Sequence, residues 1–258
     1  MSKLKYSVVL DSVCQGKDPF KAMEEVKAAG FDAFEFWRWS DKDLAATKAK
    51  ADSLGLSCVT FGWMKNIVNL TDPKDHEAWI EGLKGSIDAA KIMGNSILGA
   101  PVGNDTGARR DFQYRSVVKA LKTALPIITE NNITLNIEPL NGRINHIGTY
   151  LESSDEAFAI LDDVGSCNVK LLFDIYHQQI SEGDIINRMV KRITQIGHVH
   201  CAGSDGRREL DIGELNHPYI FQALSDAGYD GYIGLEWFPA GDSLSGLKRM
   251  YEYLHKPL

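Results

Sequence analysis

Short apolar runs alternate with amphipathic helical stretches along the whole chain, and this alternation constrains the fold more than any other feature of the sequence. Eight runs have the composition of strands: YSVVL, AFEFW, SCVTFGW, SILGAP, TLNIEPL, KLLFDIY, IGHVHCA and YIGLEWF. Strands that alternate with helices are typical of parallel sheets, because a parallel connection must return across the sheet and a helix does this compactly. The alternation therefore predicts eight βα units.

The helical stretches begin at residues that suit the first turn of a helix, near Asp18, Asp41, Pro73, Asp111, Ser154, Asp184, Asn216 and Ser243. Side chains of Asp, Asn and Ser accept hydrogen bonds from the free N–H groups at a helix start. Glycine follows several stretches, as in AAGFDAFEF and IMGNSILGA, where it permits the left-handed residue that ends a helix.

A chain of 258 residues has the length of a single (β/α)8 barrel. No stretch rich in Pro, Gly or Ser divides the eight units into two parts. A doubly wound open sheet is the alternative, but CQGKDPF after the first strand lacks the glycine-rich turn of its nucleotide-binding form. We therefore predict an α/β fold, a single TIM barrel domain over residues 1–258.

Composition and charge argue against two classes of partner. The chain contains no apolar stretch long enough to cross a bilayer and no secretion signal, so we expect a cytoplasmic protein with no membrane partner. A net charge of -7 opposes approach to a phosphate backbone, and nucleic acid is therefore not expected as a partner. The four cysteines lack metal-type spacing and are expected to be reduced: Cys14, Cys58, Cys167 and Cys201.

Ionisable residues stand at the ends of the last four predicted strands, namely Glu138, Asp174, His200 and Glu236. TIM barrels build their sites at the C-terminal ends of the strands, so these side chains are predicted to meet at one rim. Three converging carboxylates repel one another unless a cation lies between them. Oxygen ligands with one imidazole suit a divalent metal, and Mn, Mg, Co and Zn all remain candidates.

Other aromatic and imidazole side chains have weaker signals. His198 shares a strand face with His200 because side chains alternate along a strand, and we assign it a core hydrogen bond deeper in the barrel. His146 either contacts the site or bonds within its own loop. Three histidines in helical or loop contexts are expected to be solvated: His76, His217 and His255. Three tryptophans after strands two and three either form a wall for a sugar or pack in the rim: Trp37, Trp39 and Trp63.

Five segments carry a family resemblance through their order and spacing along the chain: IEPLN, FDIYHQQ, GHVHCAG, GRRELDIGELN and GLEW. With these segments the chain resembles the xylose isomerase-like TIM barrels, specifically the hydroxypyruvate isomerase branch and its ketose 3-epimerase relatives. The resemblance runs from AGFDAFEFW to the final helix. It implies one divalent cation held by the four strand-end residues, with two of them, Glu138 and Glu236, as the acid/base pair.

The resemblance also implies residues that bind substrate oxygens. They are His177 of FDIYHQQ and an arginine of GRRE, where alignment with the pattern G-R-x-E-x-x-x-G-E favours Arg207 over Arg208. Glu35, in the EF of the second strand, is expected to contact substrate or to orient a neighbouring side chain. Relatives of this kind form homodimers or homotetramers, which we expect here as well.

The predicted chemistry is removal of a proton next to a carbonyl, which needs a base and stabilisation of the enediolate that forms. Return of the proton to the neighbouring carbon makes the chain a hydroxypyruvate isomerase-like enzyme for a small keto-acid or keto-sugar. Return to the opposite face makes it a ketose 3-epimerase. His200 is more typical of the epimerase branch, and HIGTY lacks the usual Pro-Gly, so both reactions stay open.

Three further alternatives share the scaffold or the site. An inosose dehydratase-like lyase would follow proton removal with loss of water. An abasic-site endonuclease would need more histidines at the strand ends than this chain has, and the acidic net charge disfavours DNA. A non-catalytic metal-binding or sugar-binding protein would bind its ligand without proton exchange.

Overall fold

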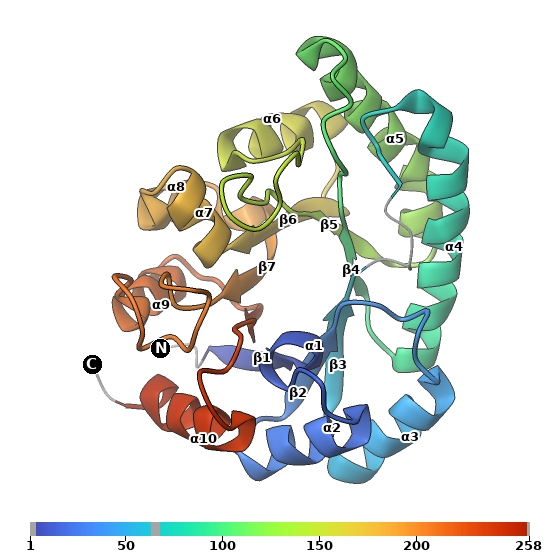
Figure 1. The fold of residues 1–258 in the computed structure, drawn as a ribbon. Helices are drawn as coiled ribbons and strands as arrows, with labels where there is room; N and C mark the ends of the chain where they lie inside the picture. Colours follow the sequence, from blue (N-terminus) through green and yellow to red (C-terminus); the bar gives the residue numbers. More distant parts are fainter. Residues whose placement is uncertain (1–3, 63–67, 257–258) are drawn as a thin grey trace.

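A computed structural model describes residues 4–62 and 68–256. In it, parallel strands close into a barrel in the order β1 to β8, which confirms the predicted TIM barrel (Figure 1). The strands lie close to the eight predicted runs: β1 Lys5–Val9, β2 Ala33–Phe36, β3 Ser57–Phe61, β4 Ile97–Ala100, β5 Thr134–Ile137, β6 Val169–Asp174, β7 Ile196–Cys201 and β8 Tyr232–Leu235.

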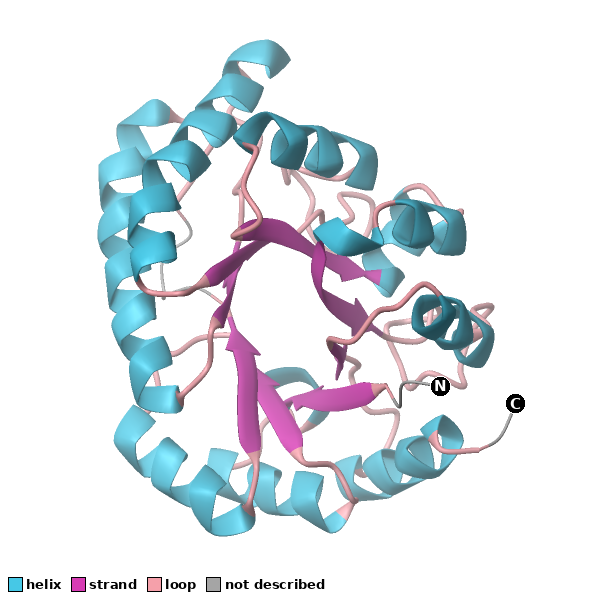
Figure 2. Cartoon of the chain, turned by 180° about the vertical axis from the view of Figure 1, so that it is seen from behind, coloured by secondary structure: helices cyan, strands magenta, loops and turns pink. Residues whose placement is uncertain are grey.

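Helices form an outer ring around the strands (Figure 2). The helices that correspond to the predicted stretches connect successive strands or follow the last: α2 Pro19–Ala28, α3 Leu44–Leu54, α4 His76–Met93, α5 Arg110–Glu130, α6 Ser154–Val164, α8 Ile185–Lys191, α9 His217–Asp226 and α10 Ser243–Leu254. Capping follows the expected pattern, because the Asp18 carboxylate accepts hydrogen bonds from backbone N–H groups at the start of α2. Gly55 and Gly165 take left-handed conformations at the ends of α3 and α6.

The described part of the chain also contains short helices: α1 Leu10–Val13, α7 Ile175–Ser181, and the 3-10 turns η1 Pro73–Asp75, which precedes α4, and η2 Ile193–Gln195. Strand β6 ends at Asp174, as predicted, and the last two residues of the run KLLFDIY, Ile175 and Tyr176, begin α7. The Asp174 carboxylate Oδ1 accepts hydrogen bonds from the backbone N–H groups of Tyr176 at 2.8 Å and His177 at 3.3 Å. The same side chain therefore ends β6 and caps α7, which turns His177 toward the barrel rim.

Both faces of the strands are buried, because side chains fill the barrel and the helix ring covers its outside. Apolar residues of the strands, such as Val8, Leu98 and Leu135, are 0% exposed. Polar residues are buried as well, among them Ser7 and His198. No helix in the described part of the chain is long and apolar enough to span a membrane.

Candidate active site

The ends of four consecutive strands bring four potential metal ligands together. Glu138 directly follows β5, Asp174 ends β6, His200 lies in β7 and Glu236 directly follows β8. One ligand atom from each lies within 4.8 Å of the others. Register explains part of this convergence, because Asp174 is paired with His200 across the sheet and His200 with Gly234 of β8. The structure thus brings together the four residues that the sequence placed at one rim.

Three members of the cluster, Glu138, His200 and Glu236, line a cavity of about 460 Å³ at the C-terminal ends of the strands. This volume lies in the range of small-molecule sites in proteins. The lining combines an apolar wall with polar groups, and includes Phe36, Trp37, Arg38, Phe61, Glu138, Leu140, Asn145, His146, Leu172, His177, His200, Arg207, Glu236 and Phe238.

The guanidinium of Arg207 lies inside the acidic cluster. Its Nη2 is 3.0 Å from Oδ2 of Asp174 and 2.5 Å from Oε2 of Glu236, and the residue is 7% exposed. Arg208 is exposed instead and donates hydrogen bonds to the backbone carbonyls of Phe238 and Pro239. Of the two adjacent arginines, the structure therefore brings Arg207 to the site.

Two carboxylates of the cluster have opposite electrostatic surroundings. Burial raises the pKa of Glu236, but the cations Arg207 and His200 lower it more, so the pKa lies well below its usual range. Burial raises the pKa of Glu138 to about 8, with His200 acting against this and Glu236 adding to it. No hydrogen bond within the described residues stabilises the Glu138 carboxylate. Without a metal ion, Glu236 is ionised while Glu138 takes up a proton near neutral pH.

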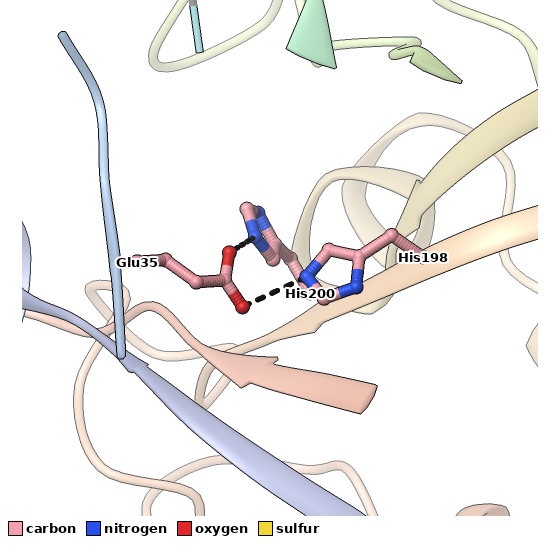
Figure 3. Close-up of side chains that lie close together, drawn as sticks. All are labelled: Glu35, His198 and His200. Atoms are coloured by element: carbon pink, nitrogen blue, oxygen red, sulfur yellow. Dashed lines mark hydrogen bonds and ion pairs between the residues drawn. The ribbon is translucent and has the colours of Figure 1, made fainter. Parts of the chain in front are cut away.

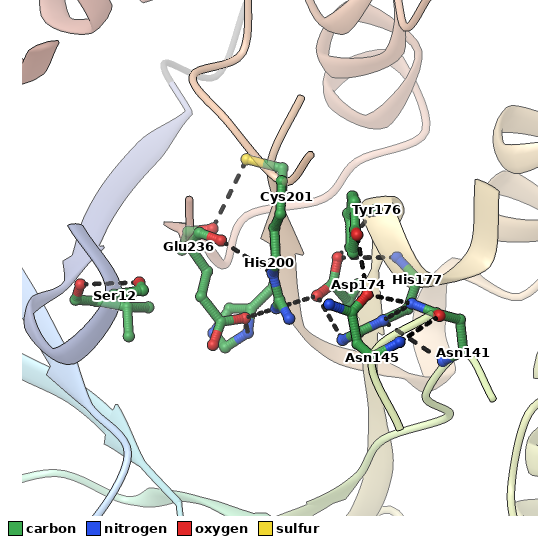
Figure 4. Close-up of polar contacts among 12 residues, drawn as sticks. Ser12, Asn141, Asn145, Asp174, Tyr176, His177, His200, Cys201 and Glu236 are labelled. Carbon is green, nitrogen blue, oxygen red and sulfur yellow. Dashed lines mark hydrogen bonds and ion pairs between the residues drawn. The ribbon is translucent and has the colours of Figure 1, made fainter. Parts of the chain in front are cut away.

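His177 presents an N–H group to the cavity. The backbone N–H of Asn141 donates to its Nδ1 at 3.4 Å, and the Asn141 side chain lies 2.6 Å from the same atom (Figure 4). Burial lowers the pKa of His177 to about 4, so the ring is neutral. Because Nδ1 accepts, Nε2 carries the proton, and it lies 3.5 Å from Oδ2 of Asp174.

Glu35 lies deeper in the barrel, between two imidazoles. Its Oε1 is 2.9 Å from Nε2 of His198 and its Oε2 is 2.9 Å from Nε2 of His200 (Figure 3). Burial raises the pKa of Glu35, but these two histidines lower it more, to about 2. The core hydrogen bond expected for His198 is thus present, and its partner is Glu35.

The family model of the xylose isomerase-like TIM barrels matches residues 23–254. The chain belongs to this family. A curated relative of this barrel, the 2-oxo-tetronate isomerase of Cupriavidus necator, is 33% identical over 234 residues, which cover 88% of the chain and 90% of the relative. The hydroxypyruvate isomerase of Escherichia coli is 28% identical over 270 residues, covering 97% and 99%.

Solved structures of the xylose isomerase-like fold match nearly the whole chain. A protein described as AP endonuclease, family 2, from Brucella melitensis has a TM-score of 0.90 and 25% identity, covering 97% of this chain and 99% of that one. The D-allulose 3-epimerase from Methylomonas sp. has a TM-score of 0.82 and 22% identity, covering 98% and 97%. The curated relatives are isomerases, so the prediction of an enzyme of the isomerase class is confirmed.

The donor chemistry of this xylose isomerase-like barrel fits a divalent cation. Three carboxylates converge with the imidazole of His200, whose Nδ1 is turned toward them. That nitrogen lies 3.0 Å from Oε2 of Glu236. A divalent ion suits this mixture of oxygen and imidazole ligands and offsets the repulsion among the carboxylates.

Two of the remaining aromatic expectations are decided by the structure. Trp37 lines the cavity and donates a hydrogen bond from Nε1 to Oε1 of Glu236 at 2.5 Å. Trp39 donates to Ser86 Oγ at 2.9 Å and packs against the core instead. Trp63 lies outside the described residues. The sequence signal for Trp37 was its position after β2, but nothing in the sequence indicated its bond to Glu236.

The remaining histidines differ in burial. His146 lines the cavity, with its ring centroid 5.1 Å from that of His177, so it contacts the site. His217 was expected to be solvated, and this is wrong: it is 0% exposed, with Nδ1 2.9 Å from the Leu210 carbonyl oxygen. His76 is half-buried against Ser116, whereas His255 is exposed as expected.

Proposed function

We propose that this chain is a metal-dependent isomerase of the hydroxypyruvate isomerase type, which interconverts a small keto-acid or keto-sugar with its isomer. One observation carries the proposal: Glu138 and Glu236 lie in one small-molecule cavity, in one metal-type cluster, with opposite proton affinities. The curated relatives, a 2-oxo-tetronate isomerase and a hydroxypyruvate isomerase, support a keto-acid as substrate.

Glu138 and Glu236 would share the acid/base work. Ionised Glu138 has no hydrogen bond within the described residues that competes for its lone pairs, so it is suited to take the proton from the carbon next to the substrate carbonyl. Returning that proton to the neighbouring carbon, together with transfer of the hydroxyl proton to the former carbonyl oxygen, completes an isomerisation. The Glu236 carboxylate contacts Trp37 Nε1, His200 Nδ1 and Arg207 Nη2. These contacts fix the orientation of the second acid/base group.

The cluster Glu138, Asp174, His200 and Glu236 would hold one ion of Mn, Mg, Co or Zn. When bound, such an ion supplies Lewis-acid stabilisation of negative charge on the substrate oxygens. His177 adds a neutral N–H donor at Nε2, which suits an oxygen that gains charge during proton removal. Arg207 adds a buried guanidinium beside the same oxygens.

Arg38 would recognise the carboxylate of a keto-acid substrate. It lines the cavity and forms no ion pair with another residue in the described part of the chain. Arg207 is already paired with two carboxylates of the cluster. Arg38 therefore supplies an uncommitted positive charge at the rim, which a keto-acid would use and a neutral ketose would not.

The testing experiment is incubation of the Mn²⁺-loaded chain with small keto-acids and ketoses in deuterium oxide, followed by proton NMR. We expect loss of a C–H signal together with formation of an aldehyde or ketone isomer. Glu138→Gln should slow the deuterium exchange about 10²- to 10⁴-fold, the effect expected for loss of a general base. Glu25→Gln is the control, because Glu25 bonds Lys17 on the outer face of the barrel.

Other outcomes identify other reactions. A product with one inverted stereocentre would make the chain a ketose 3-epimerase, and a product lighter by one water would make it an inosose dehydratase-like lyase. Tight Mn²⁺ binding without deuterium exchange across the panel would contradict the isomerase proposal and favour a metal-binding or sugar-binding protein.

A further inference from the structure

Glu35 reaches His200 across two intervening strands inside the barrel. The barrel order places β8 and β1 between β7, which carries His200, and β2, which carries Glu35. The residues at this level of β8 and β1 are Gly234 and Ser7, which are paired with each other in register. Both are small, so the carboxylate and the imidazole can meet above them.

Gly234 leaves the space that this contact requires. A Cβ atom at position 234 would lie 2.5 Å from Cδ2 of His200 and 2.6 Å from Oε1 of Glu35. Both distances are shorter than real Cβ contacts. Glycine at this position of β8 therefore allows the Glu35 carboxylate to reach Nε2 at the edge of the His200 ring.

Three donors hold the Glu35 carboxylate, which is 2% exposed. Oε1 accepts a hydrogen bond from the Ser7 hydroxyl and lies 2.9 Å from Nε2 of His198. Oε2 lies 2.9 Å from Nε2 of His200. A carboxylate with its oxygens occupied in this way has little freedom to turn toward a substrate. Its orientation is set by the protein, and in turn it sets the orientation of the His200 ring.

The Glu35 contact distinguishes the two nitrogens of His200. An ionised carboxylate only accepts hydrogen bonds, so Nε2 of His200 must carry the proton. The other nitrogen, Nδ1, faces the acidic cluster, 3.0 Å from Oε2 of Glu236. In a neutral imidazole with its proton on Nε2, the lone pair is on Nδ1, so Nδ1 is the nitrogen that can bind a metal ion.

We propose that Glu35 is a positioning residue, which holds the His200 ring with Nε2 protonated and so directs Nδ1 to the metal ion. The inference rests on the metal site of the proposed function, but not on the identity of the substrate. Metal-bound histidines commonly donate their second N–H to a carboxylate in this way, and loss of that carboxylate weakens metal binding.

A second metal ion is the alternative reading of the same residues. Glu35, His198 and His200 also place three ligand atoms within 4.8 Å of one another. Their N to O distances of 2.9 Å are hydrogen-bond lengths, which place protons rather than an ion between these atoms. The proposal therefore predicts one ion per chain, and a second ion bound by Glu35 would overturn it.

The first test identifies the ligand atom in the wild-type full-length chain. The chain is labelled with ¹⁵N-histidine, loaded with ¹¹³Cd²⁺ and studied by NMR, with His200→Gln to assign the signals. We expect cadmium coupling at Nδ1 of His200 and a proton on Nε2. Coupling at Nε2, or cadmium bound to His198 as well, would contradict the proposal.

The second test measures metal affinity without substrate, so its result does not depend on the isomerase proposal. Titration of metal-free Glu35→Gln with Mn²⁺ should show an affinity roughly 10- to 100-fold weaker than wild type. Gln can donate as well as accept, so the His200 proton should no longer be confined to Nε2 in the ¹⁵N spectrum.

Glu25→Gln is the matched control for the Mn²⁺ titration. Like Glu35, Glu25 accepts a hydrogen bond from a serine hydroxyl, that of Ser243, but it lies outside the cavity. The Glu25→Gln variant should bind Mn²⁺ with the affinity of wild type, even if it loses as much folding stability as Glu35→Gln. Equal Mn²⁺ affinities of folded Glu35→Gln and wild type would overturn the proposal. Should Glu35→Gln fail to fold, the cadmium experiment on the wild-type chain still decides it.

Discussion

The indole Nε1 of Trp37 lies 2.5 Å from Oε1 of Glu236, which joins a residue directly after β2 to one directly after β8. Trp37 is 38% exposed, so its ring covers one side of the cavity while its N–H holds the carboxylate. The cavity wall and the orientation of Glu236, the proposed second acid/base group, therefore depend on the same side chain.

Trp37→Phe should lower kcat more than it changes KM, because it keeps an aromatic wall and removes the hydrogen bond to Glu236. Loss of one bond to an ionised carboxylate predicts a fall in kcat of roughly 10-fold, or about 1.4 kcal/mol. Trp39→Phe is the control, since its indole N–H bonds Ser86 away from the cavity. Steady-state kinetics of both variants check this, and an unchanged kcat for Trp37→Phe would refute it.

Metal binding should stabilise the folded chain. Mn²⁺ at 100 times its Kd adds about 2.7 kcal/mol, which corresponds to a rise in Tm of roughly 5 to 10 °C. Asp174→Asn should greatly reduce this rise, because it removes one ligand charge. Its amide oxygen can still cap α7, so the variant should fold. Scanning calorimetry with and without Mn²⁺ measures both effects, and a full Tm rise in Asp174→Asn would contradict the assigned ligand set.

His217 should make stability depend on pH. Burial lowers its pKa to about 4, although hydrogen bonds to the Leu210 and Ala202 carbonyls act in the opposite direction. The unfolded chain, with a histidine pKa of about 6.5, binds a proton that the folded chain does not bind until pH falls to about 4. The stabilising effect of the neutral ring is therefore complete above pH 6.5 and lost as pH falls toward 4, on the order of 3 kcal/mol.

Urea unfolding of wild type and His217→Gln between pH 4 and pH 8 tests this pH dependence. The difference in the free energy of unfolding between the two proteins should be constant above pH 7 and should shrink or change sign below pH 6. A difference that is independent of pH over the whole range would show that the His217 ring does not titrate as described.

Arg38→Met should discriminate between acidic and neutral substrates. An exposed ion pair contributes up to about 1 kcal/mol, so the KM for a keto-acid should rise about 5-fold, with little effect on a neutral ketose. Arg109→Met is the control, because Arg109 pairs with Asp111 on an exposed surface. Equal effects of Arg38→Met on both substrate types would remove Arg38 from carboxylate recognition.

Local patterns in the sequence determined the barrel and the content of its rim. Alternating strand and helix signals predicted the βα units, since hydrophobic periodicity and helix caps depend on neighbours only a few residues away. The ends of those strands carried Glu138, Asp174, His200 and Glu236, and parallel strands place their C-terminal ends on one edge. The residues that meet at the rim could therefore be predicted without knowing any side-chain contact.

Helix boundaries show where local patterns were insufficient. The apolar run KLLFDIY did not indicate that Ile175 and Tyr176 begin a helix, because a short buried helix and a strand have the same composition. The capping bonds of Asp174 decide the boundary, and they depend on the position of the carboxylate in three dimensions. The burial of His217 at the start of α9 is a similar case, since its local sequence resembles that of a solvated helix start.

Only the tertiary structure decided which side chains from distant strands touch. Glu35 and His200 are 165 residues apart, and Trp37 and Glu236 are 199 residues apart. Each pair meets because the closed barrel, with its particular register, aligns the strands that carry them, and Gly234 and Ser7 leave room between Glu35 and His200. A shift of one residue in register would turn these side chains to the opposite face, and no local pattern specifies that register.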